Sequence, residues 1–154
     1  MVKVSEFPEE LRKKFLARTD MPTFDETPFV KGKPLSERRI ALISTGGMHD
    51  RADTPFDETS ADYRIISKSI DSNDLVMSHI STNYDRLGFQ RDINVALPID
   101  RMKELEIEGV IGSLADYHYS FMGATPPEKM EPYVKDMVKL FIKDAVDTVL
   151  LCPV

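Results

Sequence analysis

The stretch Arg39-Ile-Ala-Leu-Ile-Ser-Thr45, which runs directly into Gly46-Gly47, decides the fold class of this chain. Its apolar residues follow one another without the alternation that marks a strand with one face in water. The stretch is therefore typical of a strand buried on both sides. Strands of that kind occur in parallel sheets whose two faces are covered by helices. The stretch thus predicts an α/β fold.

The rest of the chain supplies the other elements that such a fold needs. We expect further strands at residues 63–66, 75–79, 110–114 and 117–121, a helix at residues 99–108, a second helix after residue 125, and a buried strand at residues 145–154. A polar stretch at residues 81–94 is expected to be an irregular loop. Strands that alternate with helices in this way predict a three-layer α/β fold, with a mainly parallel sheet between flanking helices.

The bounds of the two longer helices are predicted from the residues at their ends. Asp100 is placed to cap the first helix, and Gly109 is placed to end it. The second helix opens with Thr125-Pro-Pro-Glu128, which has capping-box spacing. Because proline lacks the N–H of a helical hydrogen bond, Pro132 is expected to delay the regular part of this helix until Glu131.

Residues 1–38 are expected to form a proline-rich N-terminal arm with one short helix, ahead of an α/β domain at residues 39–154. The helix is predicted at residues 9–18, where apolar residues share one side. After it come Pro22, Pro28 and Pro34, and no apolar period survives them. Because the chain stops at the end of its final predicted strand, we expect the domain to be incomplete at its C-terminus.

Composition excludes several classes of protein. With 154 residues, of which 42% are hydrophobic and 30% charged, the chain fits one globular domain. Its formal net charge of -6 argues against nucleic acid as a partner, since nucleic-acid-binding domains present basic surfaces. No apolar run approaches the ~18 residues of a membrane-spanning helix, and the N-terminus has no apolar signal core. A single cysteine suits a reducing compartment, so we expect a cytoplasmic protein.

Two loops that follow predicted strands carry candidate binding residues. At Thr45, Gly46 and Gly47, paired glycines let backbone N–H groups approach an anion such as a substrate carboxylate, although a tight turn explains them equally well. The polar loop after residue 81 offers Asn83 and Asp85 as hydrogen-bonding side chains. A solvated loop with Asx turns is the competing interpretation.

The histidines and the cysteine are the remaining candidates for chemistry. His79 and His118 lie near the ends of predicted strands, so they can meet at one rim of the sheet, as substrate contacts or as structural hydrogen-bonding groups. Together with aspartates they have the ligand types of a metal site, but no pair has helical spacing, and we expect no metal. Cys152 is expected to be inert, as most lone buried cysteines are.

Several separated motifs resemble one known family. They are Arg39-Ile-Ala-Leu-Ile-Ser-Thr-Gly-Gly-Met-His49, Asp74-Leu-Val-Met-Ser-His-Ile-Ser-Thr-Asn-Tyr-Asp-Arg86, Gln90-Arg-Asp-Ile-Asn94, Leu97-Pro-Ile-Asp-Arg101, Glu108-Gly-Val-Ile-Gly-Ser-Leu-Ala115, His118-Tyr-Ser-Phe-Met-Gly123 and Val146-Asp-Thr-Val-Leu-Leu151. In this order they resemble the selenoprotein B family of glycine, sarcosine, betaine and D-proline reductases, over residues 39–154.

The resemblance implies an oxidoreductase subunit that reductively cleaves a C–N bond in glycine, an N-methylated glycine or D-proline. In this family the strand after the last helix leads into a Sec-x-x-Cys or Cys-x-x-Cys motif. The catalytic residue is therefore expected immediately after Val154, and Cys152 does not match the motif. Because selenocysteine is encoded by UGA, we expect this chain to be a truncated product that ends at that codon and is inactive alone.

The resemblance also implies partners and a site. We expect no cofactor in this chain, selenocysteine in the full-length protein, a small amino-acid substrate, and a partner subunit with a pyruvoyl group that activates the substrate. The backbone of residues 45–47 and the loop of residues 78–85 are expected to line the site, with His79 and His118 beside the nucleophile.

Two other functions stay open on the sequence. A non-catalytic binding or assembly subunit of α/β fold would use the N-terminal arm to dock on a partner. A hydrolase or lyase would use the histidines with a metal. A final strand without a neighbour also exposes apolar surface, so we expect the chain to form an oligomer.

Overall fold

The structure of the chain is a computed structural model that describes residues 4–17, 25, 30–81 and 86–154. It separates into two compact units, Met1–Lys31 and Gly32–Val154. In the first unit, the 3-10 helix η1 (Val4–Glu6) precedes α1 (Glu9–Leu16). Arg18, Pro22 and Pro28, which the sequence assigns to the helix end and to the proline-rich arm, lie outside the described residues. The arm itself stays a prediction.

The second unit contains the elements of the α/β fold. In chain order they are η2 (Leu35–Glu37), β1 (Arg39–Ser44), β2 (Met48–Asp50), β3 (Arg64–Ser67), β4 (Leu75–Met77), α2 (Leu87–Arg91), η3 (Ile93–Val95), α3 (Ile99–Ile107), β5 (Ser113–Leu114), β6 (Tyr117–Ser120), α4 (Pro127–Lys143) and β7 (Thr148–Cys152). Among the helices that the structure describes, none is both long and apolar enough to cross a membrane.

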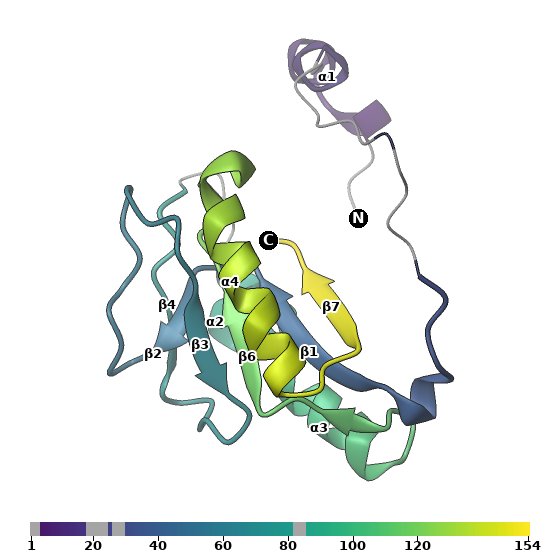
Figure 1. Cartoon of the computed structure of the whole chain (residues 1–154). Coiled ribbons are helices and arrows are strands. Elements are labelled where there is room, and N and C mark those ends of the chain that lie inside the picture. Colours follow the sequence, from purple (N-terminus) through teal and green to yellow (C-terminus); the bar gives the residue numbers. More distant parts are fainter. Residues whose placement is uncertain (1–3, 18–24, 26–29, 82–85) are drawn as a thin grey trace. The chain divides into compact units, whose positions relative to one another are not determined.

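Strand β1 lies at the centre of the main sheet (Figure 1). It pairs in parallel with β5 and β6 along one edge and with β7 along the other, while β3 pairs antiparallel with β6. Strands β2 and β4 form a separate antiparallel pair. The predicted α/β fold with a mainly parallel sheet is therefore confirmed.

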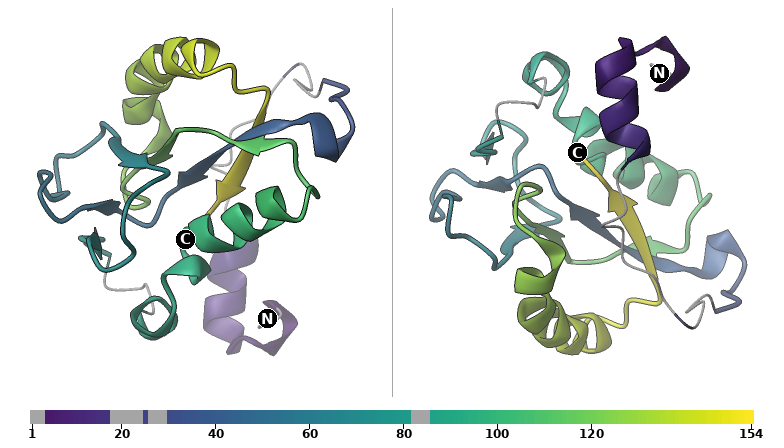
Figure 2. Two further views of the ribbon diagram at one scale, coloured as in Figure 1. Left: turned by 90° about the horizontal axis from the view of Figure 1, so that it is seen from below. Right: turned by 90° about the horizontal axis from the view of Figure 1, so that it is seen from above.

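Helices α3 and α4 cover opposite faces of this sheet (Figure 2). Leu42 belongs to the core under α3, where Ile99 and Met102 are buried. Ile43 packs on the core under α4, where Met137 is buried. Because neighbouring residues of a strand point to opposite faces, β1 supplies Ile40 and Leu42 to one core and Ile43 to the other. This division explains why the apolar run of β1 is unbroken.

The start of α3 differs from the prediction. Residues 81–94 are not wholly irregular, since they contain α2 and most of η3. Asp100 does not cap α3, because Pro98 occupies the N-cap position and Asp100 lies in the first turn. Instead, the side-chain oxygen of Asn94 accepts the N–H of Asp100 at 3.0 Å. Gly109, with a φ of 72°, follows the helix end as predicted.

The start of α4 also differs from the prediction. The helix begins at Pro127 and continues through Pro132, whose ring nitrogen cannot donate to the carbonyl of Glu128. The predicted capping box is wrong: Pro126 is the N-cap residue, and the hydroxyl of Thr125 donates to the carbonyl of Ser60 at 2.7 Å.

Strand β7 lies within the predicted residues, but the prediction that it is buried is wrong. Its central residues Val149, Leu150 and Leu151 are exposed, the last of them by 67%. Among the described strands, β7 pairs with β1 alone. Apolar residues predict burial only where neighbouring strands and helices cover them, and β7 has one such neighbour.

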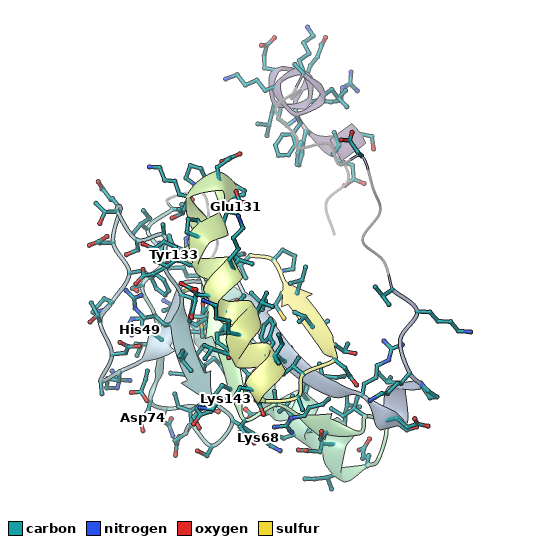
Figure 3. The ribbon with its side chains drawn as sticks, in the orientation of Figure 1. His49, Lys68, Asp74, Glu131, Tyr133 and Lys143 are labelled. Atoms are coloured by element: carbon teal, nitrogen blue, oxygen red, sulfur yellow. The ribbon has the colours of Figure 1, made fainter. Side chains whose placement is uncertain are left out.

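Arg39 joins the start of β1 to the loop that precedes β7. Its guanidinium donates to the backbone carbonyl of Asp144 at 2.6 Å and forms an ion pair with the Asp144 carboxylate. That carboxylate also accepts the N–H of Asp116 at 2.9 Å. Burial alone would raise the pKa of Asp144, but the hydrogen bonds from Arg39 and Asp116 outweigh it and lower the pKa. Figure 3 labels Lys143, which marks this end of α4.

We expect Arg39→Met to lower the free energy of unfolding by about 3 kcal/mol near pH 7, because it leaves a mostly buried carboxylate without its cation. Arg101→Met is the matched control, since the ion pair of Arg101 with Glu104 is at least half exposed. We expect that control to cost less than about 0.5 kcal/mol. Urea unfolding measures both variants, and equal losses would contradict the assignment.

Candidate functional site

The loop after β1 is held by hydrogen bonds from the backbone of both glycines. Gly46 forms an isolated antiparallel bridge with Met122, and its N–H donates to the hydroxyl of Ser44 at 3.0 Å. The N–H of Gly47 donates to the carbonyl of Phe121 at 2.9 Å. Both N–H groups are thus engaged within the protein. An anion could bind to them only by replacing these bonds.

Close backbone approaches require glycine at two positions of this site. Gly47 has a φ of 63°, and a Cβ there would lie 3.1 Å from the backbone nitrogen of His79. A Cβ on Gly123 would lie 2.7 Å from the carbonyl oxygen of Thr45 and 3.2 Å from Nε2 of His79. Thr45 and His79 therefore lie close together beyond the end of β1. We call Thr45, Gly47, His79 and Gly123 the strand-end cluster.

His79 is buried in the strand-end cluster. Its Nδ1 accepts the N–H of Ser81 at 3.2 Å, and its carbonyl accepts a hydrogen bond from the guanidinium of Arg86. Burial first, and then the positive charge of Arg86, lower the pKa of His79. The imidazole is therefore neutral near pH 7. Because Nδ1 accepts, the proton of the neutral ring is on Nε2, the atom that lies near Gly123.

Thr45 binds the last residue of β7 and the segment beyond it. Its N–H donates to the carbonyl of Cys152 at 3.2 Å, and its hydroxyl accepts the N–H of Val154 at 2.9 Å. The same hydroxyl lies 3.5 Å from the carbonyl oxygen of Val154. The end of β7 is thereby attached to the strand-end cluster.

His118 lies within the sheet rather than at the end of β1. It pairs with Ile66 of β3, and its Nδ1 accepts the N–H of Leu42, in the middle of β1, at 3.2 Å. On this edge, β1 pairs with β5 up to Ile40 and with β6 from Ile43, so Leu42 lies in the gap between these two strands. The ring of His118 supplies the acceptor for the backbone N–H of Leu42 in this gap. Burial lowers the pKa of His118 to about 4, which keeps the ring neutral.

The other predicted candidates are placed as follows. Asn83 and Asp85 lie outside the described residues. Burial raises the pKa of the Cys152 thiol, so it is protonated near pH 7 and a poor nucleophile. Within the part of the chain that the structure describes, no three or more His, Cys, Asp or Glu residues form a group that could hold a metal ion.

Four residues around this site were not among the site residues predicted from the sequence: Ser44, Arg86, Ser120 and Gly123. The hydroxyl of Ser44 donates to the carbonyl of Ala96 at 2.8 Å, and the hydroxyl of Ser120 accepts the N–H of Met48 at 2.8 Å. At Ser44, a small residue at the end of an apolar run is the only local signal. The partners of Ser44 and Ser120 are 52 and 72 positions away, so no local pattern identifies these two serines.

Known proteins match this chain over most of its length. The family model described as Glycine/sarcosine/betaine reductase selenoprotein B matches residues 10–153. The sarcosine reductase complex component B subunit beta of Peptoclostridium acidaminophilum is 32% identical over 146 residues, which are 90% of this chain and 33% of that protein. The D-proline reductase subunit gamma of Acetoanaerobium sticklandii is 33% identical over 122 residues, 77% of this chain and 50% of that protein. No solved structure matches.

A third relative gives the same result. The glycine reductase complex component B subunit gamma of Symbiobacterium thermophilum is 34% identical over 137 residues, which are 85% of this chain and 32% of that protein. The chain thus spans a third to a half of the length of these relatives. The matches confirm the resemblance inferred from the motifs, and the whole strand-end cluster lies inside the matched region.

We expect Gly123→Ala to lower the free energy of unfolding by about 2 kcal/mol, because the new methyl group overlaps the carbonyl of Thr45. Gly88→Ala in α2 is the matched control. A Cβ there meets only Val95, at 3.5 Å, and alanine favours a helix, so stability should hold or rise slightly. Urea unfolding compares the two variants. If Gly123→Ala left the free energy of unfolding unchanged, the cluster would have room for a side chain.

The buried ring of His118 predicts a specific acid sensitivity. Its pKa falls from an ordinary 6.5 to about 4 on folding, so the unfolded chain binds this proton more tightly. Above about pH 6.5 the ring is neutral in both states and does not lower the free energy of unfolding. As the pH falls from 6.5 towards 4, proton binding by the unfolded chain lowers that free energy, by about 3 kcal/mol in total. His118→Gln retains an acceptor but cannot titrate. We expect its unfolding free energy to fall less steeply than that of the wild type between pH 7 and 4.5, and parallel curves would refute this.

Proposed function

Because this chain belongs to the selenoprotein B family of glycine, sarcosine and betaine reductases, we propose that it is the N-terminal part of a reductase component B that cleaves a C–N bond. The proposed substrate is glycine, an N-methylated glycine or D-proline, since the relatives are named as glycine, sarcosine and D-proline reductase subunits. We assign the activity to a longer protein and expect this chain alone to be inactive.

The contact between Thr45 and Val154 is the observation that carries this proposal. The reactive selenocysteine or cysteine is proposed to follow Val154 immediately. In parallel α/β proteins, ligands bind beyond the carboxyl ends of the strands. The N–H of Val154 donates to the Thr45 hydroxyl, and Thr45 lies close to His79 in the strand-end cluster. This contact supports a position beside His79 for the reactive residue.

Each member of the strand-end cluster has a proposed role. Thr45 positions the backbone that precedes the reactive residue. His79 is neutral near pH 7 and carries its proton on Nε2, so it can donate a hydrogen bond at the reacting centre. Gly46 and Gly47 shape the loop, and the missing side chains of Gly47 and Gly123 leave room for His79.

Other predicted site residues have less direct support. Asn83 and Asp85 stay proposed substrate contacts. His118 is a proposed positioning residue, because the one described hydrogen bond of its ring fixes the middle of β1. The strand that it supports ends at Ser44, directly before Thr45.

The partner and the reactive group belong to the longer assembly. A selenol is largely ionised near neutral pH, so it supplies a nucleophile that the Cys152 thiol, with its raised pKa, does not. A partner subunit with a pyruvoyl group stays the proposed activator of the substrate amine. The relatives that are named as components of complexes support a multi-subunit assembly.

The alternative is a non-catalytic binding or assembly subunit of α/β fold. The exposed apolar residues of β7 favour it, because such a surface suits a protein contact. The codons after Val154 separate the two functions. A UGA or cysteine codon that begins a Sec-x-x-Cys or Cys-x-x-Cys motif supports the reductase. A UAA or UAG codon, or a continuation without the motif, supports the alternative.

In the full-length protein, we expect Thr45→Val to slow turnover by about tenfold or more, because a misplaced reactive group loses the benefit of positioning. Thr45→Ser keeps the hydroxyl and should keep most of the turnover. The assay measures release of ammonia from glycine, release of methylamine from sarcosine, and ring opening of D-proline, with partner subunits and a dithiol reductant.

Two controls make this test specific. Urea unfolding of both variants separates a loss of positioning from a loss of fold. The alkylation rate of the reactive selenol or thiol should fall in Thr45→Val and recover in Thr45→Ser. Normal turnover of Thr45→Val would remove the positioning role. A wild-type protein that lacks the motif and acts on none of the three substrates would overturn the proposed function.

A further inference from the structure

Helix α4 carries an apolar row that its own domain leaves uncovered. Val134, Val138 and Ile142 are spaced four residues apart, so they lie one above the other on one side of the helix. They are 39%, 46% and 74% exposed. Contiguous apolar surface on a soluble protein usually marks a contact with another polypeptide.

This row lies on the side of α4 that is nearer to β7. Leu140, which is roughly opposite to the row at 100° per residue, lines a cavity of about 460 Å³ together with Ile65 of β3 and Tyr117 of β6. Strand β7 lies on the other side of β1 from these two strands (Figure 1). The row therefore borders β7.

Strand β7 contributes a second exposed row on the same face of the sheet. Val149 and Leu151 pair with Ala41 and Ile43 of β1. Residues that pair directly point to the same face, and Ile43 packs on the core under α4. The two rows together form one patch, which we call the α4–β7 surface: Val134, Val138, Ile142, Val149 and Leu151.

A helix packed beside α4 would cover the α4–β7 surface. Neighbouring strands lie about 4.8 Å apart and packed helices about 10 Å apart, so one helix covers about two strands. Helix α4 covers β6 and β1 through its contacts with Tyr119 and Ile43, and it leaves β7 exposed. A second copy added antiparallel along β7 would extend the sheet, but its own α4 would lie too far away to cover both β7 strands.

The free edge of β7 fits the same arrangement. Among the described residues, this edge pairs with no strand. The segment from β6 through α4 to β7 crosses the sheet in one direction with its helix on one face. Connections between parallel strands are right-handed. If the next connection leads from β7 to a parallel strand on its free edge, the helix in that connection therefore lies on the same face as α4. That helix would lie over β7, beside α4.

We propose that the α4–β7 surface binds an amphipathic α-helix from the part of reductase component B that lies outside the region matched by this chain, and that the strand next to this helix pairs with β7. The matched region is 33% of the sarcosine reductase relative and 32% of the glycine reductase relative, so the family has polypeptide to supply this helix. The proposal rests on family membership and does not depend on the redox chemistry.

The test co-expresses this chain with a tagged polypeptide made of the P. acidaminophilum sarcosine reductase subunit without its matched region. We expect a one-to-one complex, with slower amide hydrogen exchange over residues 134–142 and 148–152 in the complex than in the chain alone. Ile142→Glu and Leu151→Glu should each weaken the association by about tenfold or more, because binding would bury a charge. Ile107→Glu is the matched control, since Ile107 is 86% exposed at the end of α3.

Three results would overturn this proposal. The first is the absence of a complex. The second is a complex that neither Ile142→Glu nor Leu151→Glu weakens. The third is a stoichiometric homodimer in sedimentation that both variants abolish and the control keeps, which would make a second copy the occupant. Urea unfolding of the three variants verifies that each is folded. None of these measurements reads activity, so a failure here leaves the proposed reductase function unaffected.

Discussion

The parallel pairing of β1 with β7 is the interaction on which the rest of the site depends. The two strands run in register over five residues, and the other edge of β1 is paired with β5 and β6. Both strands therefore end at the same rim of the sheet. Thr45 can bind the backbone after β7 only because of this register. A shift by one residue would turn every side chain of β7 to the opposite face.

Different forces hold the two ends of β1. At its start, the guanidinium of Arg39 bonds the carbonyl and the carboxylate of Asp144, so charge attaches the strand to the loop before β7. At its end, close packing takes over, because Gly47 and Gly123 leave no space for a Cβ. Charge can adapt to small movements, whereas backbone packed at van der Waals distance cannot. The rigid end is the one that carries the strand-end cluster.

His79 and His118 share a similar sequence signal and have different positions. Both were predicted near strand ends, and burial lowers the pKa of each. His118 comes near the start of β6, so its ring bonds the middle of β1. His79 comes after the end of β4 and lies against Gly47 and Gly123. The distinction depends on strand direction and on which strands are neighbours, and neither can be read from the residues around a histidine.

The sequence by itself determined the α/β class, the central strand, the existence of α3 and α4, and the family, because apolar runs, helical periods and motif order are local properties of a chain. Tertiary structure alone decided which apolar strand is buried. Both β1 and β7 are rich in apolar residues, but β1 has strands on both edges and a helix on each face, whereas β7 has one described neighbour. It also decided that Asn94 caps α3, and that Thr45 meets a residue 109 positions away. Such contacts depend on how distant segments pack, so no local pattern encodes them.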